Sequence, residues 1–97
     1  MNGASPRWRS ILDQNSPVRQ WDGEFLVFNP RNASTHLIGA AAYEVMSALI
    51  AARQALTLPE LAAQLVGAEA ADAAFHAELG QCLEQFEDLG LAESLPA

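Results

Sequence analysis

The stretch RQWDGEFLVFNPRNASTHLIG, Arg19–Gly39, predicts a three-stranded antiparallel meander. Its first turn is Asp22–Gly23, and these residue types tolerate the positive φ that both positions of a type I′ turn require. Glu24–Phe28 carries apolar residues on both faces, which is typical of a central strand. Ser34–Ile38 is then the third strand and lies at an edge of the sheet. The two-residue turn pairs Trp21 with Glu24, Gln20 with Phe25, Arg19 with Leu26 and Val18 with Val27.

The chain after the meander predicts three helices. The first covers about Ala40–Ala52, the second begins after Thr57 and ends near Gly67, and the third covers about Asp72–Leu89. The third helix has an apolar stripe, because residues three and four apart share one helix face. The stripe consists of Phe75, Leu79, Cys82, Leu83, Phe86 and Leu89.

Two of these helices have capping signals at their ends. Thr57 and Glu60 have the spacing of a capping box, in which each side chain accepts a hydrogen bond from the other residue's backbone N–H. Gly90 follows the third helix and predicts a left-handed C-cap. These signals place the start of the second helix and the end of the third.

The length of 97 residues has room for one domain with a modest core. We predict an α+β, winged-helix-like fold, with an N-terminal three-stranded antiparallel meander followed by three helices. Residues 1–17 are predicted to be an N-terminal arm that packs on the domain, and residues 18–97 to be the domain itself.

Charge and composition exclude several classes of function. The five basic residues are all arginines that precede Thr57, whereas eight acidic residues follow it. A recognition helix for DNA needs basic side chains, so the acidic third helix argues against nucleic-acid binding. No apolar run approaches the roughly 18 residues that a membrane-spanning helix needs. A single cysteine is consistent with a reducing cytoplasm, where we expect the protein to be located.

The residues that could perform catalysis do not form a recognisable set. Cys82 lies within the apolar stripe, which favours a buried hydrophobic role over that of a nucleophile. His76 lies at the border of the stripe, and His36 lies in the edge strand. These three residues lack the spacing of metal ligands. The sequence has no lysine and no glycine-rich phosphate loop. We therefore expect a protein that is not an enzyme and that holds no metal or cofactor.

The predicted edge strand is the feature that points to binding. Ser34–Ile38 contains no proline, lysine or glutamate, which are residues that commonly protect an exposed edge. An unprotected edge can accept a partner peptide as an added strand, held by backbone hydrogen bonds. The sequence leaves two alternatives to peptide binding open: the N-terminal arm covers the edge, or the edge pairs with that of a second copy.

Several short motifs, in the same order and with similar spacing, resemble the PqqD family of peptide chaperones. This family supplies the recognition element for ribosomally made, modified peptides, and the closer resemblance is to the branch found with HPr-kinase-related proteins. Two departures stand at the start of the first helix, where Gly39 and Ala40 replace a capping asparagine or aspartate and a proline. The motifs are Val18–Pro30 with its Trp-Asp-Gly-Glu turn, Thr35–Ile38, Ala42–Met46, Leu58–Leu61 and Phe86–Leu91.

The resemblance implies that a leader peptide binds as an extra strand along the third strand, in a groove completed by the third helix. The strand residues implied are Ser34, Thr35, His36, Leu37 and Ile38, and the helix residues are Phe75, His76, Leu79, Leu83 and Phe86. The implied function is that of a non-catalytic chaperone, which binds the leader of a precursor peptide and presents it to a peptide-modifying enzyme. The acidic helical half favours a leader with basic residues beside aliphatic anchors.

A structural role is the alternative prediction. In it the chain is an adaptor homodimer that docks a partner enzyme without binding peptide itself. Trp21, Leu26 and Phe28 share one face of the meander, and three helices can hardly cover both faces of the sheet. This unprotected apolar face is the observation that supports the alternative.

Overall fold

The Asp22–Gly23 turn sets the register of the meander. The computed structural model describes residues 6–13, 15–29, 31, 33–52 and 54–96, and in it both turn residues have positive φ, 53° and 80°. β2 (Val18–Trp21) pairs antiparallel with β3 (Glu24–Asn29), which pairs antiparallel with β4 (Ser34–Gly39). The four residue pairs predicted between β2 and β3 are confirmed.

The three predicted helices are α1 (Ala40–Ala51), α2 (Leu58–Val66) and α3 (Ala73–Asp88). Gly39 precedes α1 and offers no side-chain cap. Asp72 caps α3 by accepting a hydrogen bond from the Phe75 N–H at 2.9 Å. The left-handed C-cap predicted after α3 is confirmed, because Gly90 has a φ of +77°.

The capping box at the start of α2 is also confirmed. The Thr57 N–H donates to Oε1 of Glu60 at 2.8 Å, and the Glu60 N–H donates to Oγ1 of Thr57 at 3.3 Å. Two hydrogen bonds with Thr57 lower the pKa of Glu60, and the bond from the Thr57 backbone has a larger effect than the bond with its side chain. The charge of Arg7 lowers the pKa further. A lowered pKa in the folded state stabilises the fold above the pKa of the unfolded chain, and this stabilisation is lost as the pH falls through the folded value.

Replacing Thr57 with alanine should reduce the free energy of unfolding by about 1 kcal/mol, because the Glu60 N–H loses its acceptor. Thr57→Ser keeps the hydroxyl and serves as the matched control, with an unfolding free energy close to that of the wild type. Urea unfolding at pH 7 measures both. Equal losses in the two variants would mean that the threonine methyl group, and not the cap, provides the stabilisation.

A second three-stranded sheet was not predicted from the sequence. β1 (Arg7–Ser10) is its middle strand, between β5 (Leu56–Thr57) and β6 (Ala92–Leu95), and both pairings are antiparallel. Strands of two to four residues are too short to show an alternating pattern, and β1 joins segments from distant parts of the chain. The α+β class and the meander before three helices are as predicted, whereas the winged-helix likeness stays a prediction.

The second sheet changes the prediction for the N-terminal arm. Residues 7–10 are a strand of the fold, whereas residues 1–5 and 14 of the predicted arm, and residues 30, 32, 53 and 97 of the predicted domain, lie outside the described residues. Arg9 Nε lies 2.7 Å from the Glu93 carboxylate across the β1–β6 pair. Because both side chains of this ion pair are partly exposed to solvent, it contributes little to stability.

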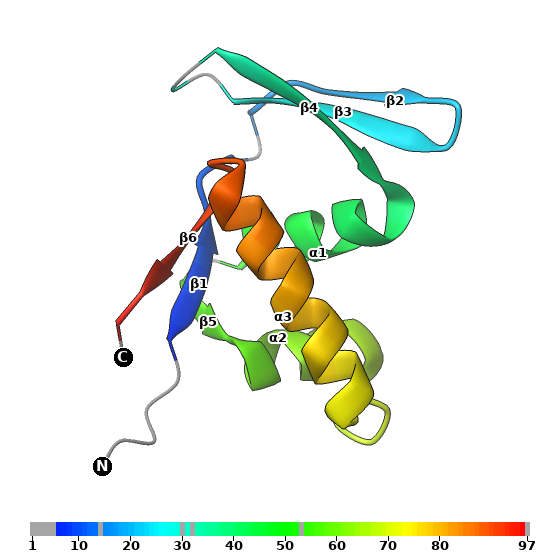
Figure 1. Cartoon of the computed structure of the whole chain (residues 1–97), viewed down its shortest axis with the longest axis vertical. Helices are drawn as coiled ribbons and strands as arrows, with labels where there is room; N and C mark the ends of the chain where they lie inside the picture. Colours follow the sequence, from blue (N-terminus) through cyan, green and yellow to red (C-terminus); the bar gives the residue numbers. More distant parts are fainter. Residues whose placement is uncertain (1–5, 14, 30, 32, 53, 97) are drawn as a thin grey trace.

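The core lies beneath one face of the meander. The helices all lie on that side, and none of the helices and strands that the structure describes covers the opposite face of the meander (Figure 1). The ring of Phe25 stacks on that of Tyr43 with centroids 3.9 Å apart, which joins β3 to α1. The buried apolar side chains include Trp8, Leu12, Val27, Ile38, Val45, Met46, Leu49, Leu61, Leu79, Leu83, Phe86 and Leu91.

Gly80 has a packing role that the sequence did not reveal. A Cβ atom at this position would lie 3.3 Å from Cδ1 of Leu58, which is tighter than ordinary contact. Glycine therefore allows the start of α2 to approach the middle of α3 closely, despite its cost of about 1 kcal/mol in a helix interior.

Candidate functional site

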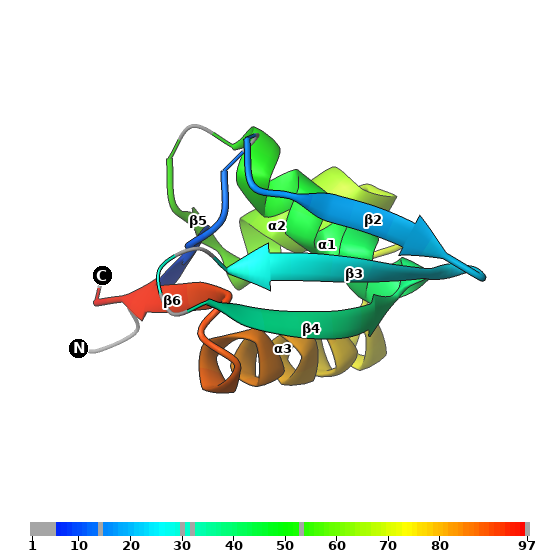
Figure 2. The ribbon, with the colours of Figure 1, turned by 90° about the horizontal axis from the view of Figure 1, so that it is seen from above.

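The candidate site begins at the free edge of β4. The sheet order is β2-β3-β4, so β4 is an edge strand, as predicted. Within the described ranges of the chain, no strand pairs with its outer side, because β1 pairs with β5 and β6. In the view from above, α3 emerges beyond β4, whereas α1 and α2 lie beneath β2 and β3 (Figure 2). The free edge of β4 therefore lies on the side of the sheet that faces α3.

The direction of the backbone groups along β4 follows from the register. The Phe28 N–H donates to the Pro17 carbonyl at 3.1 Å, so the polar backbone groups of Phe28 point away from β4. These directions alternate along an antiparallel strand. His36 therefore directs its N–H and C=O toward β3, whereas Thr35 and Leu37 direct theirs outward from the edge. An added strand would bind to the groups of Thr35 and Leu37.

The side chains of β4 alternate between the two faces of the sheet. Ser34, His36 and Ile38 share the face that covers the helices, and Nε2 of His36 lies 2.9 Å from Oγ of Ser34. Ile38 is buried in the core. Thr35 and Leu37 lie on the opposite face, where Leu37 is 54% exposed. The predicted strand residues thus divide into a set on the face that covers the helices and a set on the uncovered face.

The predicted residues of α3 divide in the same manner. Leu79, Leu83 and Phe86 are buried in the core, so their surfaces are largely unavailable to a ligand. Phe75 is half-buried and lines a hollow. His76 lies one helical turn before Gly80, on the side of α3 that packs against α2. Of the five predicted helix residues, the structure places Phe75 and Leu79 in the walls of this hollow.

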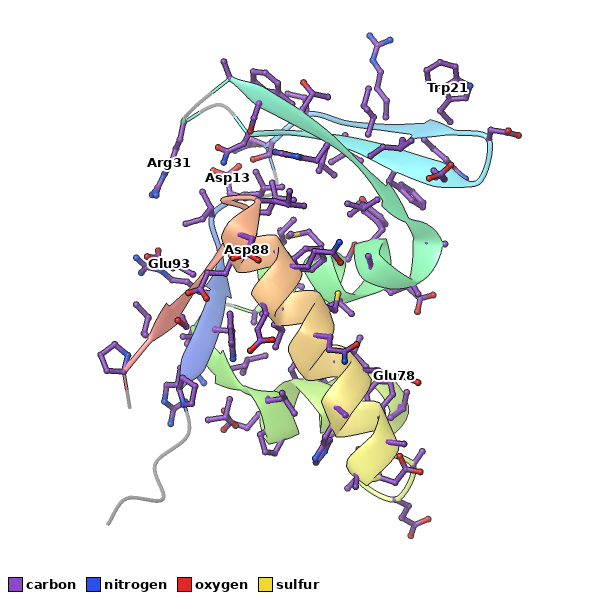
Figure 3. The ribbon with its side chains drawn as sticks, in the orientation of Figure 1. Asp13, Trp21, Arg31, Glu78, Asp88 and Glu93 are labelled. Atoms are coloured by element: carbon purple, nitrogen blue, oxygen red, sulfur yellow. The ribbon has the colours of Figure 1, made fainter. Side chains whose placement is uncertain are left out.

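The hollow has a volume of about 190 Å³ and lies between the start of α1, the end of α2 and the first half of α3. Its first residue from α1, Ala41, is two positions after the end of β4, so it lies at the C-terminal end of the free edge. Glu78 is among its acidic side chains and projects from α3 (Figure 3). The lining residues are Ala41, Ala42, Glu44, Val45, Leu65, Val66, Phe75, Glu78, Leu79 and Cys82.

Eight of the ten residues that line the hollow were not predicted as site residues, and three of these carry a carboxylate or a thiol: Glu44, Glu78 and Cys82. The spacing of Phe75, Glu78 and Cys82 at i, i+3 and i+7 puts them along one side of α3, and this signal was present in the sequence. Burial raises the pKa of the Cys82 thiol, so it remains protonated at neutral pH. This protonation is consistent with an apolar wall and unsuited to a nucleophile.

The hollow can accept an apolar side chain whose neighbour is basic. Its walls are mostly apolar, and its polar side chains are the two carboxylates of Glu44 and Glu78. A carboxylate beside an apolar surface favours arginine or lysine, whose aliphatic stems pack while the charged group pairs. Among the residues that the structure describes, no group of three or more His, Cys, Asp and Glu side chains is placed to hold a metal ion.

No protein-family model matches the chain, and neither the curated proteins nor the solved structures searched contain a match. None of the described helices combines the length and the apolar character needed to span a membrane.

Proposed function

We propose that the chain is a non-catalytic peptide chaperone that binds the leader of a ribosomally made precursor peptide and presents it to a modifying enzyme. The open edge of β4 is the observation that supports this proposal. Thr35 and Leu37 direct their backbone groups outward, which suits the addition of a strand. The resemblance to the PqqD family points to the same strand. We place this function in the cytoplasm.

The proposed ligand is an extended peptide with an apolar anchor and an adjacent basic residue. Its backbone lies along β4, its anchor enters the hollow beside Phe75, and its basic residue pairs with Glu44 or Glu78. A disordered leader loses conformational entropy when it binds, so a moderate affinity is expected. Because the peptide meets backbone groups over a short strand, the hollow supplies most of the sequence preference.

An NMR titration tests the proposal. The probe is the N-terminal half of the precursor peptide encoded beside the gene, added to the ¹⁵N-labelled full chain. We expect amide shifts concentrated at residues 34–39 and around Phe75, Glu78 and Cys82, with smaller shifts at β2. An unchanged spectrum at high peptide excess, from a well-folded sample, would contradict peptide binding.

Cys82 offers an independent measurement of the same event. As the only cysteine, it reports on the hollow when N-ethylmaleimide reacts with it. Saturating peptide should slow the reaction roughly three- to tenfold, because a bound side chain excludes most solvent from its pocket. The protection should follow the same concentration dependence as the NMR shifts. Shifts along β4 without protection would place the peptide on the edge but outside the hollow.

A structural adaptor remains the second candidate, because Trp21 and Leu37 expose apolar surface on the uncovered face of the meander. In this role the face docks a modifying enzyme, and the edge binds no peptide. The same titration separates the two functions, since an adaptor gives no shifts at β4 when peptide is added.

A further inference from the structure

The uncovered face of the meander, here called the outer face, carries an apolar surface with no role in the proposed function. The register puts Arg19, Trp21, Leu26, Phe28 and Leu37 on it. Trp21 is 71% exposed and points away from the helices (Figure 3). Three large apolar side chains are exposed among the described residues, and two of them, Trp21 and Leu37, lie on this face. Such a concentration on one face indicates an interaction surface.

The outer face also contains a shallow hollow that complements Trp21. The hollow has a volume of about 150 Å³ and lies over the half of the sheet away from the Asp22–Gly23 turn. Trp21 lies beside that turn, two to four residues from the hollow along the strands, which is roughly 7–13 Å. A projecting indole and a receiving hollow therefore lie on the same face, displaced along the strand direction. The residues around the hollow are Pro17, Arg19, Leu26, Phe28 and Thr35.

The charge of the meander favours a second copy of this chain as the occupant. Within residues 18–39, Arg19 and Arg31 balance Asp22 and Glu24, so this segment is formally neutral. The remainder of the chain therefore carries the whole net charge of −7. Two copies that meet through their outer faces keep these acidic surfaces on opposite sides of the pair, where their repulsion is smallest.

We infer that two copies pack face to face through their outer faces, with Trp21 of each copy inserted in the hollow of the other. A two-fold axis makes such an interface self-complementary, because each contact occurs twice. The indole would lie beside Arg19 of the partner copy, an arrangement that allows a cation–π interaction. The free edge of β4 stays open, because the two sheets stack and do not extend each other. This inference does not depend on the proposed function.

The small area of the face sets the expected strength of the dimer. Three strands of up to six residues cover roughly 14 by 20 Å, or about 280 Å² per copy, which is well below the roughly 800 Å² per partner of stable specific complexes. We therefore expect a weak dimer, with a Kd on the order of tens of micromolar. Added salt should strengthen it, because salt screens the repulsion between the two acidic remainders.

Sedimentation velocity of the full chain, from about 5 to 500 μM, tests the inference around the expected Kd. The wild type should pass from monomer to dimer, and Trp21→Glu should weaken the dimer at least tenfold. Val66→Glu is the matched control for dimerisation alone, because Val66 is 41% exposed and lies at the end of α2, in the wall of the hollow beside Phe75 and away from the outer face. It makes the same apolar-to-acidic change and should dimerise like the wild type.

A second variant, together with NMR spectra, distinguishes weaker dimerisation from a loss of folding. Arg19→Ala removes the cation beside the hollow and should weaken the dimer several-fold, and amide NMR spectra of all variants should show a native fold. A wild type that stays monomeric at every concentration would overturn the inference. So would a dimer that Trp21→Glu leaves intact, or one that Val66→Glu weakens equally. Failure of these tests leaves the peptide titration unaffected, so the two proposals can fail separately.

Discussion

Replacing Asn29 with alanine should lower the free energy of unfolding by about 2–3 kcal/mol, because its buried side chain makes two hydrogen bonds and both are lost. Asn29 is 1% exposed at the end of β3. Its Nδ2 donates to the Gly90 carbonyl at 2.8 Å, and its Oδ1 accepts from the Arg31 N–H at 2.9 Å. The side chain of Asn29 thus joins the end of β3 to the turn that follows α3.

Urea unfolding of Asn29→Ala measures this loss, and Asn15→Ala is the matched control. Asn15 is exposed, and its backbone N–H, which alanine retains, donates to Asp13. Its replacement should change the unfolding free energy by less than about 0.5 kcal/mol. A similarly small change in Asn29→Ala would mean that water replaces the side chain without loss, and that the link to Gly90 does not stabilise the fold.

In the variant Asn29→Asp, the free energy of unfolding should depend on pH. The substitution keeps the shape but places a carboxylate oxygen against the Gly90 carbonyl, where both groups are acceptors. Burial and this contact should raise the pKa of the new aspartate above its usual value of about 3.9. A raised pKa in the folded state means that the variant is closest to wild type below the unfolded pKa, where the protonated acid donates to Gly90. Its stability relative to the wild type should fall as the pH rises through the folded pKa.

The Asn29 link also bears on the candidate site. β4 is tied to α3 chiefly through shared packing in the core, and the bond from Asn29 to Gly90 fixes the end of β3 relative to the end of α3. Loss of this bond should let the meander move relative to α3, which would alter the space along the free edge. Asn29→Ala should therefore weaken peptide binding in the variant that remains folded.

Features that depend on a few neighbouring residues were predictable from the sequence. The register of β2 and β3 follows from Asp22–Gly23, and the start of α2 follows from Thr57 and Glu60. The end of α3 follows from Gly90. In each case the physical requirement is local: a positive φ or an acceptor for an orphan N–H.

Features that depend on segments distant in the chain were not predictable. β1 is a strand because β5 and β6 lie on either side of it, and neither short partner has a recognisable pattern. Asn29 comes directly after the predicted strand Glu24–Phe28, and its contact with Gly90 exists only in the folded chain. The role of Gly80 depends in the same manner on the position of Leu58.

The candidate site was predictable in its strand and only partly in its helix. The free edge follows from strand order alone, so β4 was identified correctly as an edge strand. The side of α3 that lines the hollow depends on how the helix is rotated against α2. The sequence could not fix this rotation: the residues implied by the resemblance included His76, whereas Glu78 and Cys82 line the hollow.

Replacing Leu37 with proline should abolish most peptide binding, with an affinity loss of at least about thirtyfold, or about 2 kcal/mol. The Leu37 N–H points outward, so proline removes a donor to the added strand and sets its ring in the path of that strand. The backbone hydrogen bonds between β4 and β3 remain, because they come from His36 and from the residues two positions before and after it. Proline is tolerated at such edge positions, so the variant should fold.

Gln20→Pro is the matched control, because it makes the same change on the opposite edge of the same sheet. Gln20 pairs with Phe25, whose backbone groups point to β4, so the Gln20 N–H also points outward, from β2. Calorimetry with the leader peptide should give Gln20→Pro an affinity within about twofold of the wild type. Thr35→Pro, at the other outward position of β4, should reproduce the loss seen with Leu37→Pro.

The pattern across these three variants decides between the mechanisms. Loss at Leu37 and Thr35 with retention at Gln20 requires a ligand that bonds to the backbone edge of β4, since the three positions share little else. Equal loss in all three would mean that binding needs the intact meander and not its edge. Binding that survives Leu37→Pro in a folded protein would exclude strand addition, and the ligand would then have to bind through the hollow between α1 and α3 alone.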